Sequence, residues 1–137
     1  MINWWLHQGY RNALVGLEID HRVASHLRRR LRRFANVRII EGDAIENLPA
    51  NGTLYYMFNP FGRELVEALK TKLATRSDRA KLTLLYYSCR HVDVFMDDPT
   101  WQVEITSVGD RTFAAFPELA VIRFAALPSD RTGASAG

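Results

Sequence analysis

The chain carries Leu-Tyr-Tyr-Met-Phe-Asn-Pro-Phe-Gly at residues 54–62. Its apolar, aromatic first half predicts a strand that is buried on both faces, as in a parallel sheet. Pro60 forces Asn59 into an extended geometry at the carboxyl end of this strand, and Gly62 lets the chain turn closely into a helix. Polar acceptors beside an aromatic ring at such a strand end are where open α/β sheets bind ligands. The alternative is a strand that ends in a structural Asn-Pro turn.

Strand and helix patterns alternate on both sides of this stretch. Short apolar runs predict strands, and apolar residues repeated every three to four positions predict helices. Strands are predicted at residues 13–19, 37–40, 54–58, 82–87, 101–106 and 119–127, and helices at residues 2–7, 21–34, 63–75 and 92–96. This order predicts an α/β fold with a doubly wound, mostly parallel sheet and a C-terminal antiparallel strand pair.

Two of the predicted helices have a clear apolar face. Asp20 is expected to cap the first of them, and Gly9 is expected to end the short helix at the start of the chain. The residues expected to point inward are Val23, Leu27, Leu31 and Phe34 in one helix and Leu65, Val66, Leu69 and Leu73 in the other.

Length and composition indicate one globular domain. The 137 residues are enough for a core, and 47% hydrophobic and 24% charged residues are ordinary values. We expect one domain over residues 1–127 and a disordered tail over residues 128–137. No apolar run approaches the roughly 18 residues of a membrane span, so no membrane partner is expected. The single cysteine, Cys89, excludes an internal disulfide and favours a reducing, cytoplasmic location.

Three signals for a ligand site fall at the carboxyl ends of three successive predicted strands. Glu18 ends the first, Gly42-Asp43 follows the second and Asn59-Pro60-Phe61 follows the third. A carboxylate at the first position can accept hydrogen bonds from both hydroxyls of a ribose, and an aspartate at the second can bind an adenine amine. Glu18 and Asp43 each have a commoner explanation alone, namely a surface acid and an Asx turn, and a structural turn explains Asn59-Pro60 about as well as a ligand site does. The ordered set of three is much less expected by chance.

At these residues the chain resembles the class I S-adenosylmethionine-dependent methyltransferases, which have a Rossmann-like sheet. The resemblance extends to about residue 127. It implies S-adenosyl-L-methionine as the cofactor, with Glu18 at its ribose and Ile19 in the adenine pocket. Asp43 would contact the adenine amine, with Gly42 and Ala44 beside it in the cofactor site. The matching motifs are Val15-Gly16-Leu17-Glu18-Ile19-Asp20, Ile40-Glu41-Gly42-Asp43-Ala44 and Phe58-Asn59-Pro60-Phe61-Gly62.

The residues Asn59, Pro60 and Phe61 are similar to the Asn/Asp-Pro-Pro-aromatic motif of methyltransferases that act on planar nitrogens. The resemblance implies that the Asn59 and Pro60 acceptors orient an amine and that the Phe61 ring stacks on its plane. Phe61 stands where that motif has its second proline. This departure weakens the match to that motif, so a planar amine is one acceptor type that the resemblance implies and the acceptor itself stays open.

The family's glycine-rich cofactor loop has no counterpart in the sequence, which contains no Gly-x-Gly. The helix at residues 2–7 corresponds to the one that follows this loop. We therefore expect an amino-terminally shortened methyltransferase that lacks the first strand and its loop. Because the family places that strand at the centre of the sheet, the strands at residues 13–19 and 54–58 should either pair directly with each other or each keep one unpaired edge.

The main basic feature is a run of five arginines within residues 28–33. The net charge of +3 and a pI near 9.3 permit an anionic partner without requiring one. A solvated helix face is the favoured interpretation of the run, and a nucleic-acid phosphate surface is the alternative. That surface would use Arg28, Arg29, Arg32 and Arg33.

The remaining chemistry-bearing residues give weaker signals. Cys89 and His91 follow a predicted strand without a third orienting group, so nucleophilic catalysis is not expected there. The four histidines show no metal-ligand spacing with Cys89, so no metal is expected.

Three functions stay open at this stage. The first is methyl transfer from S-adenosylmethionine to an unidentified acceptor near Asn59 and Phe61. The second is a non-catalytic methyltransferase remnant or interaction module that has lost the cofactor loop. The third is a nicotinamide-dinucleotide enzyme, because an acid after a strand of such a sheet also fits a dinucleotide fold.

Overall fold

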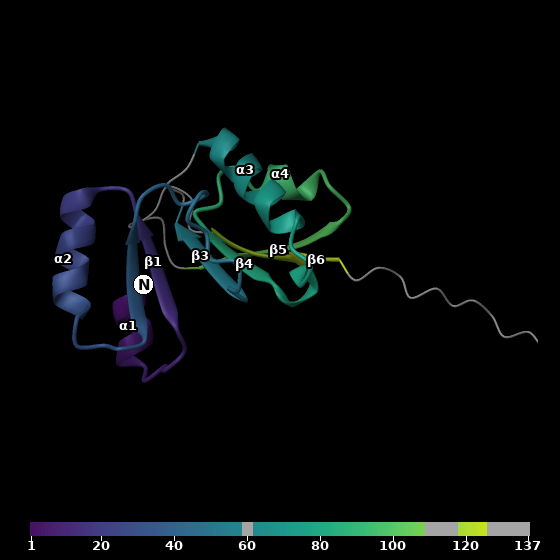
Figure 1. The fold of residues 1–137 in the computed structure, drawn as a ribbon. Coiled ribbons are helices and arrows are strands. Elements are labelled where there is room, and N and C mark those ends of the chain that lie inside the picture. The colour runs from purple at the N-terminus through teal and green to yellow at the C-terminus, as the bar shows by residue number, and fades with distance from the viewer. Residues whose placement is uncertain (59–61, 109–117, 126–137) are drawn as a thin grey trace, which may run out of the picture. The chain divides into compact units, whose positions relative to one another are not determined.

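The computed structural model describes residues 1–58, 62–108 and 118–125 (Figure 1). The chain divides into two compact units, residues 1–50 and residues 51–137. Each unit contains its own β-sheet, and the sheets have two and four strands. The two units are described separately.

The first unit consists of two helices and a parallel strand pair. Strands β1 and β2 pair in register from Leu14 with Val37 to Glu18 with Glu41, so their carboxyl ends lie side by side. Gly9 adopts φ +80° after the first helix, which is the left-handed conformation expected of a helix stop. The elements are α1 (Ile2–His7), β1 (Leu14–Glu18), α2 (His21–Leu31) and β2 (Val37–Glu41).

The core of this unit lies between α1, α2 and the strand pair. Ala24, Leu31 and Ile39 are buried, and partly buried apolar side chains from both helices pack against them. The expectation that Val23 faces inward is wrong, because Val23 is exposed and Ala24 takes its place. At 100° per residue, Ala24 lies about 20° from Leu31 around the helix, whereas Val23 lies about 80° away. Helix α2 also ends at Leu31, before the predicted end at residue 34.

Asp20 begins helix α2 as its N-cap, as expected. Its Oδ1 accepts hydrogen bonds from the backbone N–H groups of Arg22 and Val23 at 2.8 and 3.0 Å. These bonds satisfy two of the four N–H groups that a helix leaves without partners at its start.

Asp20→Ala is expected to destabilise α2 by about 1 kcal/mol because both capping bonds are lost. Hydrogen–deuterium exchange of residues 21–31 should show protection reduced about fivefold, which is the factor that corresponds to this energy. Asp20→Asn keeps a capping oxygen and should retain most of the protection. Equal protection in the alanine variant and the unmodified chain would contradict a capping role.

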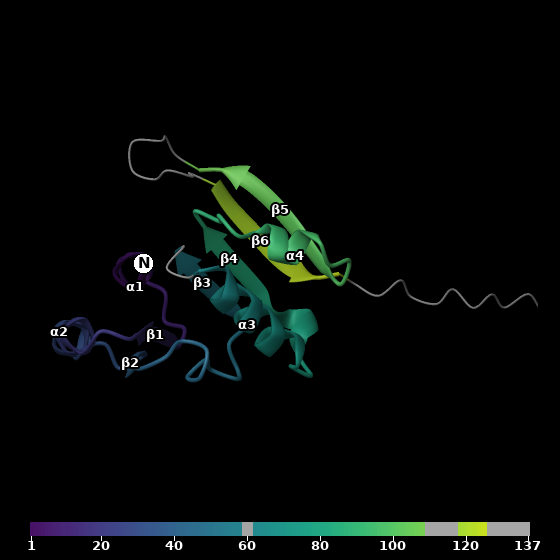
Figure 2. The same ribbon diagram turned by 90° about the horizontal axis from the view of Figure 1, so that it is seen from above.

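The second unit is a four-stranded sheet with helices on one face. Its strand order is β3-β4-β6-β5; β3 and β4 are parallel, and β6 is antiparallel to both of its neighbours (Figure 2). Helices α3 and α4 both lie over the same face of the sheet (Figure 1). The elements are β3 (Leu54–Phe58), α3 (Arg63–Ala74), the 3-10 helix η1 (Arg79–Lys81), β4 (Thr83–Tyr87), α4 (Asp93–Met96), β5 (Trp101–Ser107) and β6 (Glu118–Phe124).

Most of the predicted inward residues of α3 are buried. Val66, Leu69 and Leu73 have exposed fractions of 4% or less, whereas Leu65 is exposed, so its predicted place in the core is wrong. Leu65 lies about 100° around the helix from Val66, outside the buried stripe. The sheet contributes Leu84 and Tyr86 from β4 to this core, along with Ala120 and Ile122 from β6 and Phe95 from α4.

Strand β3 and the glycine before α3 differ from expectation. Leu54 and Phe58 are exposed, and Met57 is the one buried residue of β3, so the prediction of a strand buried on both faces is wrong. Among the described residues, β3 lies at the edge of its sheet and pairs with β4 alone, so fewer neighbouring side chains cover it. Gly62 has φ −65° and no atom of a described residue within 4 Å of an added Cβ, so its own backbone conformation does not require glycine.

Two strands keep an unpaired edge among the described residues. Strand β1 pairs only with β2, and β3 pairs only with β4. Both are parallel pairs, and the closing β5–β6 pair is antiparallel, as expected. The α/β class, the mostly parallel character of the early strands and the C-terminal antiparallel pair are therefore confirmed. Within residues 1–58, 62–108 and 118–125, no helix has both the length and the apolar character that crossing a bilayer requires.

Candidate functional site

The candidate site lies at the carboxyl ends of β1 and β2. Glu18 and Glu41 are register partners at the last position of these strands, and Gly42 N donates to Glu18 O at 3.0 Å. The structure thus brings Glu18 and Gly42 together, as the sequence predicted for the first two strand ends. Parallel strands have this effect because all their carboxyl ends meet at one edge of the sheet.

The Glu18 carboxylate keeps an acceptor for a ligand. Its Oε1 accepts a hydrogen bond from Asp20 N at 2.9 Å. Its second oxygen has no partner in the described part of the chain. Ile19, the next residue, is 74% exposed, which is unusual for a large aliphatic side chain. A carboxylate oxygen beside an exposed aliphatic group can accept hydrogen bonds from sugar hydroxyls while the apolar group packs on a planar base.

Asp43 holds the loop after β2 in place. Its Oδ1 accepts from the N–H groups of Ile45 and Glu46, both at 2.8 Å, and Asn47 Nδ2 donates to its backbone oxygen at 2.8 Å. This is the Asx-turn arrangement that the sequence analysis gave as the alternative to a ligand contact. The two roles are compatible, because the second carboxylate oxygen carries no bond to a described residue. Ala44 lies within this turn, half-buried.

Glu41 has a different environment from Glu18, although the two are register partners on neighbouring strands. Its Oε1 accepts from His21 Nδ1 at 2.8 Å, and its Oε2 accepts from Arg28 Nη1 at 3.0 Å. The hydrogen bond from His21 and, as a smaller effect, that from Arg28 hold the pKa of Glu41 below its usual value. Arg28 also donates to Ile39 O. Arg28 is one of the arginines of the alternative phosphate surface, and the structure pairs it with Glu41 instead.

The third strand-end signal falls outside the described residues. Strand β3 ends at Phe58, and helix α3 begins at Arg63. Asn59, Pro60 and Phe61 lie between them in the segment that the structure does not describe. Their proposed contact with a methyl acceptor stays a prediction from the sequence.

Cys89 lies in the core of the second unit. The thiol is buried, and this burial raises its pKa. A buried, protonated thiol is a poor nucleophile. Among the residues that the structure describes, no group of three or more histidine, cysteine or acidic side chains is placed to hold a metal ion.

Comparison with known proteins rests on structure. No protein-family profile and no curated protein matches the sequence. The 23S rRNA methyltransferase ErmE matches 83% of this chain and 53% of its own, at 19% identity and a TM-score of 0.57. An rRNA methylase from Streptococcus thermophilus matches 82% of this chain and 73% of its own, at 13% identity and a TM-score of 0.53. A precorrin 8W decarboxylase from Methanobacterium thermoautotrophicum matches 85% and 70%, at 14% identity and a TM-score of 0.51.

The chain has a class I methyltransferase-like fold. The resemblance found in the sequence and the α/β class are therefore confirmed at the level of the fold. The chain spans about half the length of ErmE. A methyltransferase-like fold can carry many activities, so the function has to be argued from the site itself.

Proposed function

We propose that this chain is an S-adenosylmethionine-dependent methyltransferase domain whose residues 1–50 hold the adenosine half of the cofactor. One observation carries the proposal. Glu18, Ile19, Gly42 and Asp43 lie at one edge of a parallel strand pair, and both carboxylates keep an oxygen that is not bonded to a described residue. The methyltransferase-like fold supports the same assignment.

Each residue of the edge has a role that fits its chemistry. Glu18 accepts hydrogen bonds from the ribose hydroxyls, and the exposed Ile19 packs against the adenine ring. Asp43 accepts a hydrogen bond from the adenine amine, while Gly42 and Ala44 line the site with backbone. Asn59, Pro60 and Phe61 are proposed, from the sequence alone, to orient a planar amine as the methyl acceptor.

The contribution of these residues to the reaction is positioning. When bound, the cofactor supplies a methyl group on a sulfonium, which is reactive enough for direct transfer to a nucleophile. Holding that methyl in line with the acceptor lowers the activation barrier of the transfer. The translational and rotational entropy that the reaction would cost has then already been lost when the reactants bind. The described residues offer this orientation on the adenosine side.

We further propose RNA as the substrate class. Two of the similar structures are described as rRNA methyltransferases or methylases. The excess positive charge of the chain also lies entirely in residues 1–50, which contain eight arginines, no lysine and five acidic residues. Residues 51–137 contain ten basic and ten acidic residues. A basic unit beside a cofactor site fits a polyanionic substrate.

The test is isothermal titration of the chain with S-adenosylhomocysteine up to millimolar concentration. Glu18→Gln keeps an oxygen for Asp20 N but loses a charged acceptor, so the affinity should fall about 10- to 100-fold. Glu41→Gln is the matched control: both of its carboxylate oxygens are already bonded, to His21 and Arg28, so the affinity should stay within about twofold of the unmodified chain.

The outcomes separate the functions that the sequence left open. No detectable heat with the unmodified chain would contradict cofactor binding and favour the non-catalytic module. Equal losses of affinity in the two glutamine variants would show that Glu18 does not contact the cofactor. Protection by NAD, but not by S-adenosylhomocysteine, in a thermal melt would favour the nicotinamide enzyme.

A further inference from the structure

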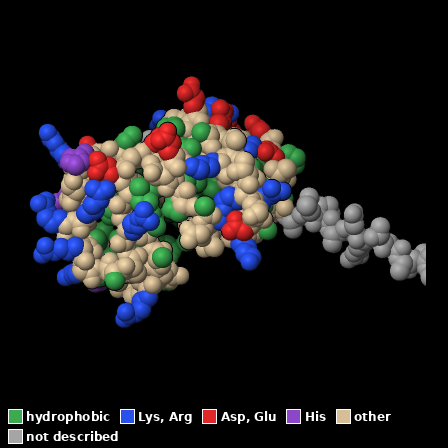
Figure 3. All heavy atoms as spheres, viewed as in Figure 1, with side chains coloured by type: hydrophobic (Ala, Val, Ile, Leu, Met, Phe, Trp, Pro, Cys, Tyr) green, Lys and Arg blue, Asp and Glu red, His purple; other side chains and the backbone are tan. Residues whose placement is uncertain are grey.

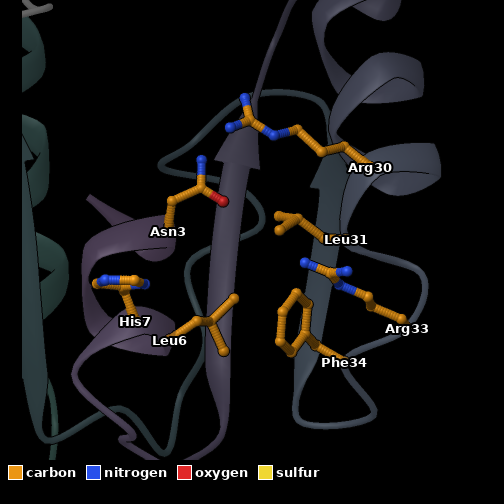
Figure 4. A pocket seen from close by; sticks show the side chains of 7 residues that line it. All are labelled: Asn3, Leu6, His7, Arg30, Leu31, Arg33 and Phe34. Carbon is orange, nitrogen blue, oxygen red and sulfur yellow. The ribbon is translucent and has the colours of Figure 1, made fainter.

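Helices α1 and α2 border a groove of about 280 Å³ in the first unit (Figure 4). No pattern in the sequence predicts this groove, because its two sides are more than 20 residues apart in the chain. The volume is several times the roughly 30 Å³ of a water molecule in the liquid. The lining residues are Asn3, Leu6 and His7 from α1 and Arg30, Leu31, Arg33 and Phe34 from the end of α2 and the turn after it.

The groove has an apolar base and polar groups at its sides. Leu6, Leu31 and Phe34 also belong to the small core of this unit. In Figure 4, the side chains of Asn3 and His7 extend from one side, and those of Arg30 and Arg33 extend from the other. The four side chains supply mainly N–H donors, and no acidic residue lines the groove. Such a donor set is suited to an anion with several acceptor oxygens.

The two groove arginines have no carboxylate partner among the described residues. Arg28, two positions away, is paired with Glu41. Arg33 instead lies over the Phe34 ring, with 5.0 Å between its guanidinium carbon and the ring centroid. An arginine stacked on an aromatic ring has fewer orientations to lose when it binds a ligand. The guanidinium groups of Arg30 and Arg33 therefore keep their full donor capacity for a bound anion.

The helix dipole opposes an anion at this place, but it is the smaller effect. The carboxyl end of a helix carries about half a negative charge, whereas Arg30 and Arg33 each carry a full positive charge. The positive surface also continues beyond the groove, since Arg29 lies on α2, Arg32 directly follows it, and basic side chains gather over α2 in Figure 3. A surface of this extent suits a chain of phosphates better than a single small anion.

We propose that this groove binds a backbone phosphate of RNA through Arg30 and Arg33, with Asn3 and His7 completing the hydrogen bonds. The site is distinct from the cofactor edge. His21 contacts Glu41 at that edge, and Arg30 follows nine residues later, about 14 Å along the helix axis. The choice of RNA rests on the proposed function, whereas binding to the groove requires neither cofactor nor methyl transfer.

The experiment is fluorescence anisotropy of a labelled, short single-stranded RNA across a salt series, without cofactor. Arg30→Gln/Arg33→Gln should weaken binding at least tenfold at low salt and reduce the slope of log K against log salt by about 0.7, the value for one phosphate of a single strand. Arg29→Gln/Arg32→Gln removes the same charge outside the groove and loses only the weaker attraction to neighbouring phosphates, so it should weaken binding no more than threefold and reduce the slope by less than the groove pair does.

A neutral substitution separates a built site from a general positive surface. Asn3→Ala leaves the net charge unchanged and should weaken RNA binding about three- to tenfold, because one hydrogen bond to the phosphate is lost. Thermal melts of all variants establish that each is folded. Equal losses for the two arginine pairs, or no effect of Asn3→Ala, would overturn the proposal.

Inorganic phosphate distinguishes the source of the anion. It should compete with RNA only at millimolar concentration or above, since it has none of the neighbouring phosphates that contact the rest of α2. Competition by inorganic phosphate at the concentration at which RNA binds would assign the groove to a small free anion and overturn the RNA proposal. Loss of cofactor binding in the titration above would leave the RNA result unchanged, so the two proposals fail independently.

Discussion

Phe95→Ala is expected to destabilise the second unit by about 3–5 kcal/mol, the usual cost of removing a fully buried aromatic side chain. Phe95 has no exposed surface, and its ring meets Trp101 edge to face with 5.1 Å between the centroids. Trp101 in turn lies 3.9 Å from the Phe124 ring by the same measure. The four-residue helix α4 positions Phe95, and Lys70 of α3 secures this helix by donating to Val94 O at 2.9 Å. Because these neighbours are held in place, they can fill little of the cavity that the alanine substitution leaves.

Urea unfolding monitored by Trp101 fluorescence measures this loss. Replacing Trp4 and Trp5 of the first unit by phenylalanine makes Trp101 the only tryptophan that reports. Met96→Ala is the control, because Met96 follows Phe95 directly and is 58% exposed, so its loss should cost less than about 0.5 kcal/mol. A typical domain is stable by about 5–15 kcal/mol, so the Phe95 variant should unfold at much lower urea. A change below 1 kcal/mol would show that this aromatic cluster does not hold the unit together.

The helices and strands of this fold can be predicted from the sequence because each depends on the pattern of apolar residues within its own segment. Strand β1 was expected at residues 13–19 and spans Leu14–Glu18, and α3 was expected at residues 63–75 and spans Arg63–Ala74. The errors concern which side of an element is buried. Val23 and Leu65 were misplaced because burial depends on the neighbouring strands, which a periodic pattern does not specify. The apolar run of β3 predicts a strand covered on both faces, whereas the exposed Leu54 and Phe58 reflect its position at a sheet edge.

The sequence predicts the residues of the candidate site that are positioned by strand ends. It does not predict which side chains pair with one another. Glu18 and Gly42 meet because two strands are parallel, and parallel order follows from the strand–helix–strand pattern. The arginine run, in contrast, looks uniform in the sequence. Only the structure separates Arg28, which is neutralised by Glu41, from Arg30 and Arg33, which line a groove with α1.

Gly42→Ala is expected to destabilise the β1–β2 pair by about 1–3 kcal/mol, the usual cost of forcing a side chain into a glycine-only backbone conformation. Gly42 has φ +136°, which residues with a side chain rarely adopt. A Cβ at this position would also lie 2.9 Å from Asn47 Nδ2, the amide that donates to Asp43 O. Relief of that contact would displace Asn47 and loosen the turn that positions Asp43.

Hydrogen–deuterium exchange of residues 14–18 and 37–41, measured without cofactor, tests this prediction. Gly62→Ala is the control, because Gly62 has φ −65° and open space for a Cβ, so its replacement should be neutral or slightly stabilising. Adding Asn47→Ala to the Gly42 variant removes the contact and leaves the backbone strain, so the double variant should recover part of the protection. The sequence suggested Gly42 only as a cofactor contact. If that were its whole role, Gly42→Ala would leave exchange unchanged without ligand and weaken only the binding of S-adenosylhomocysteine. Faster exchange in the free chain would show instead that glycine is required to hold Glu18 and Asp43 at one edge before any cofactor binds.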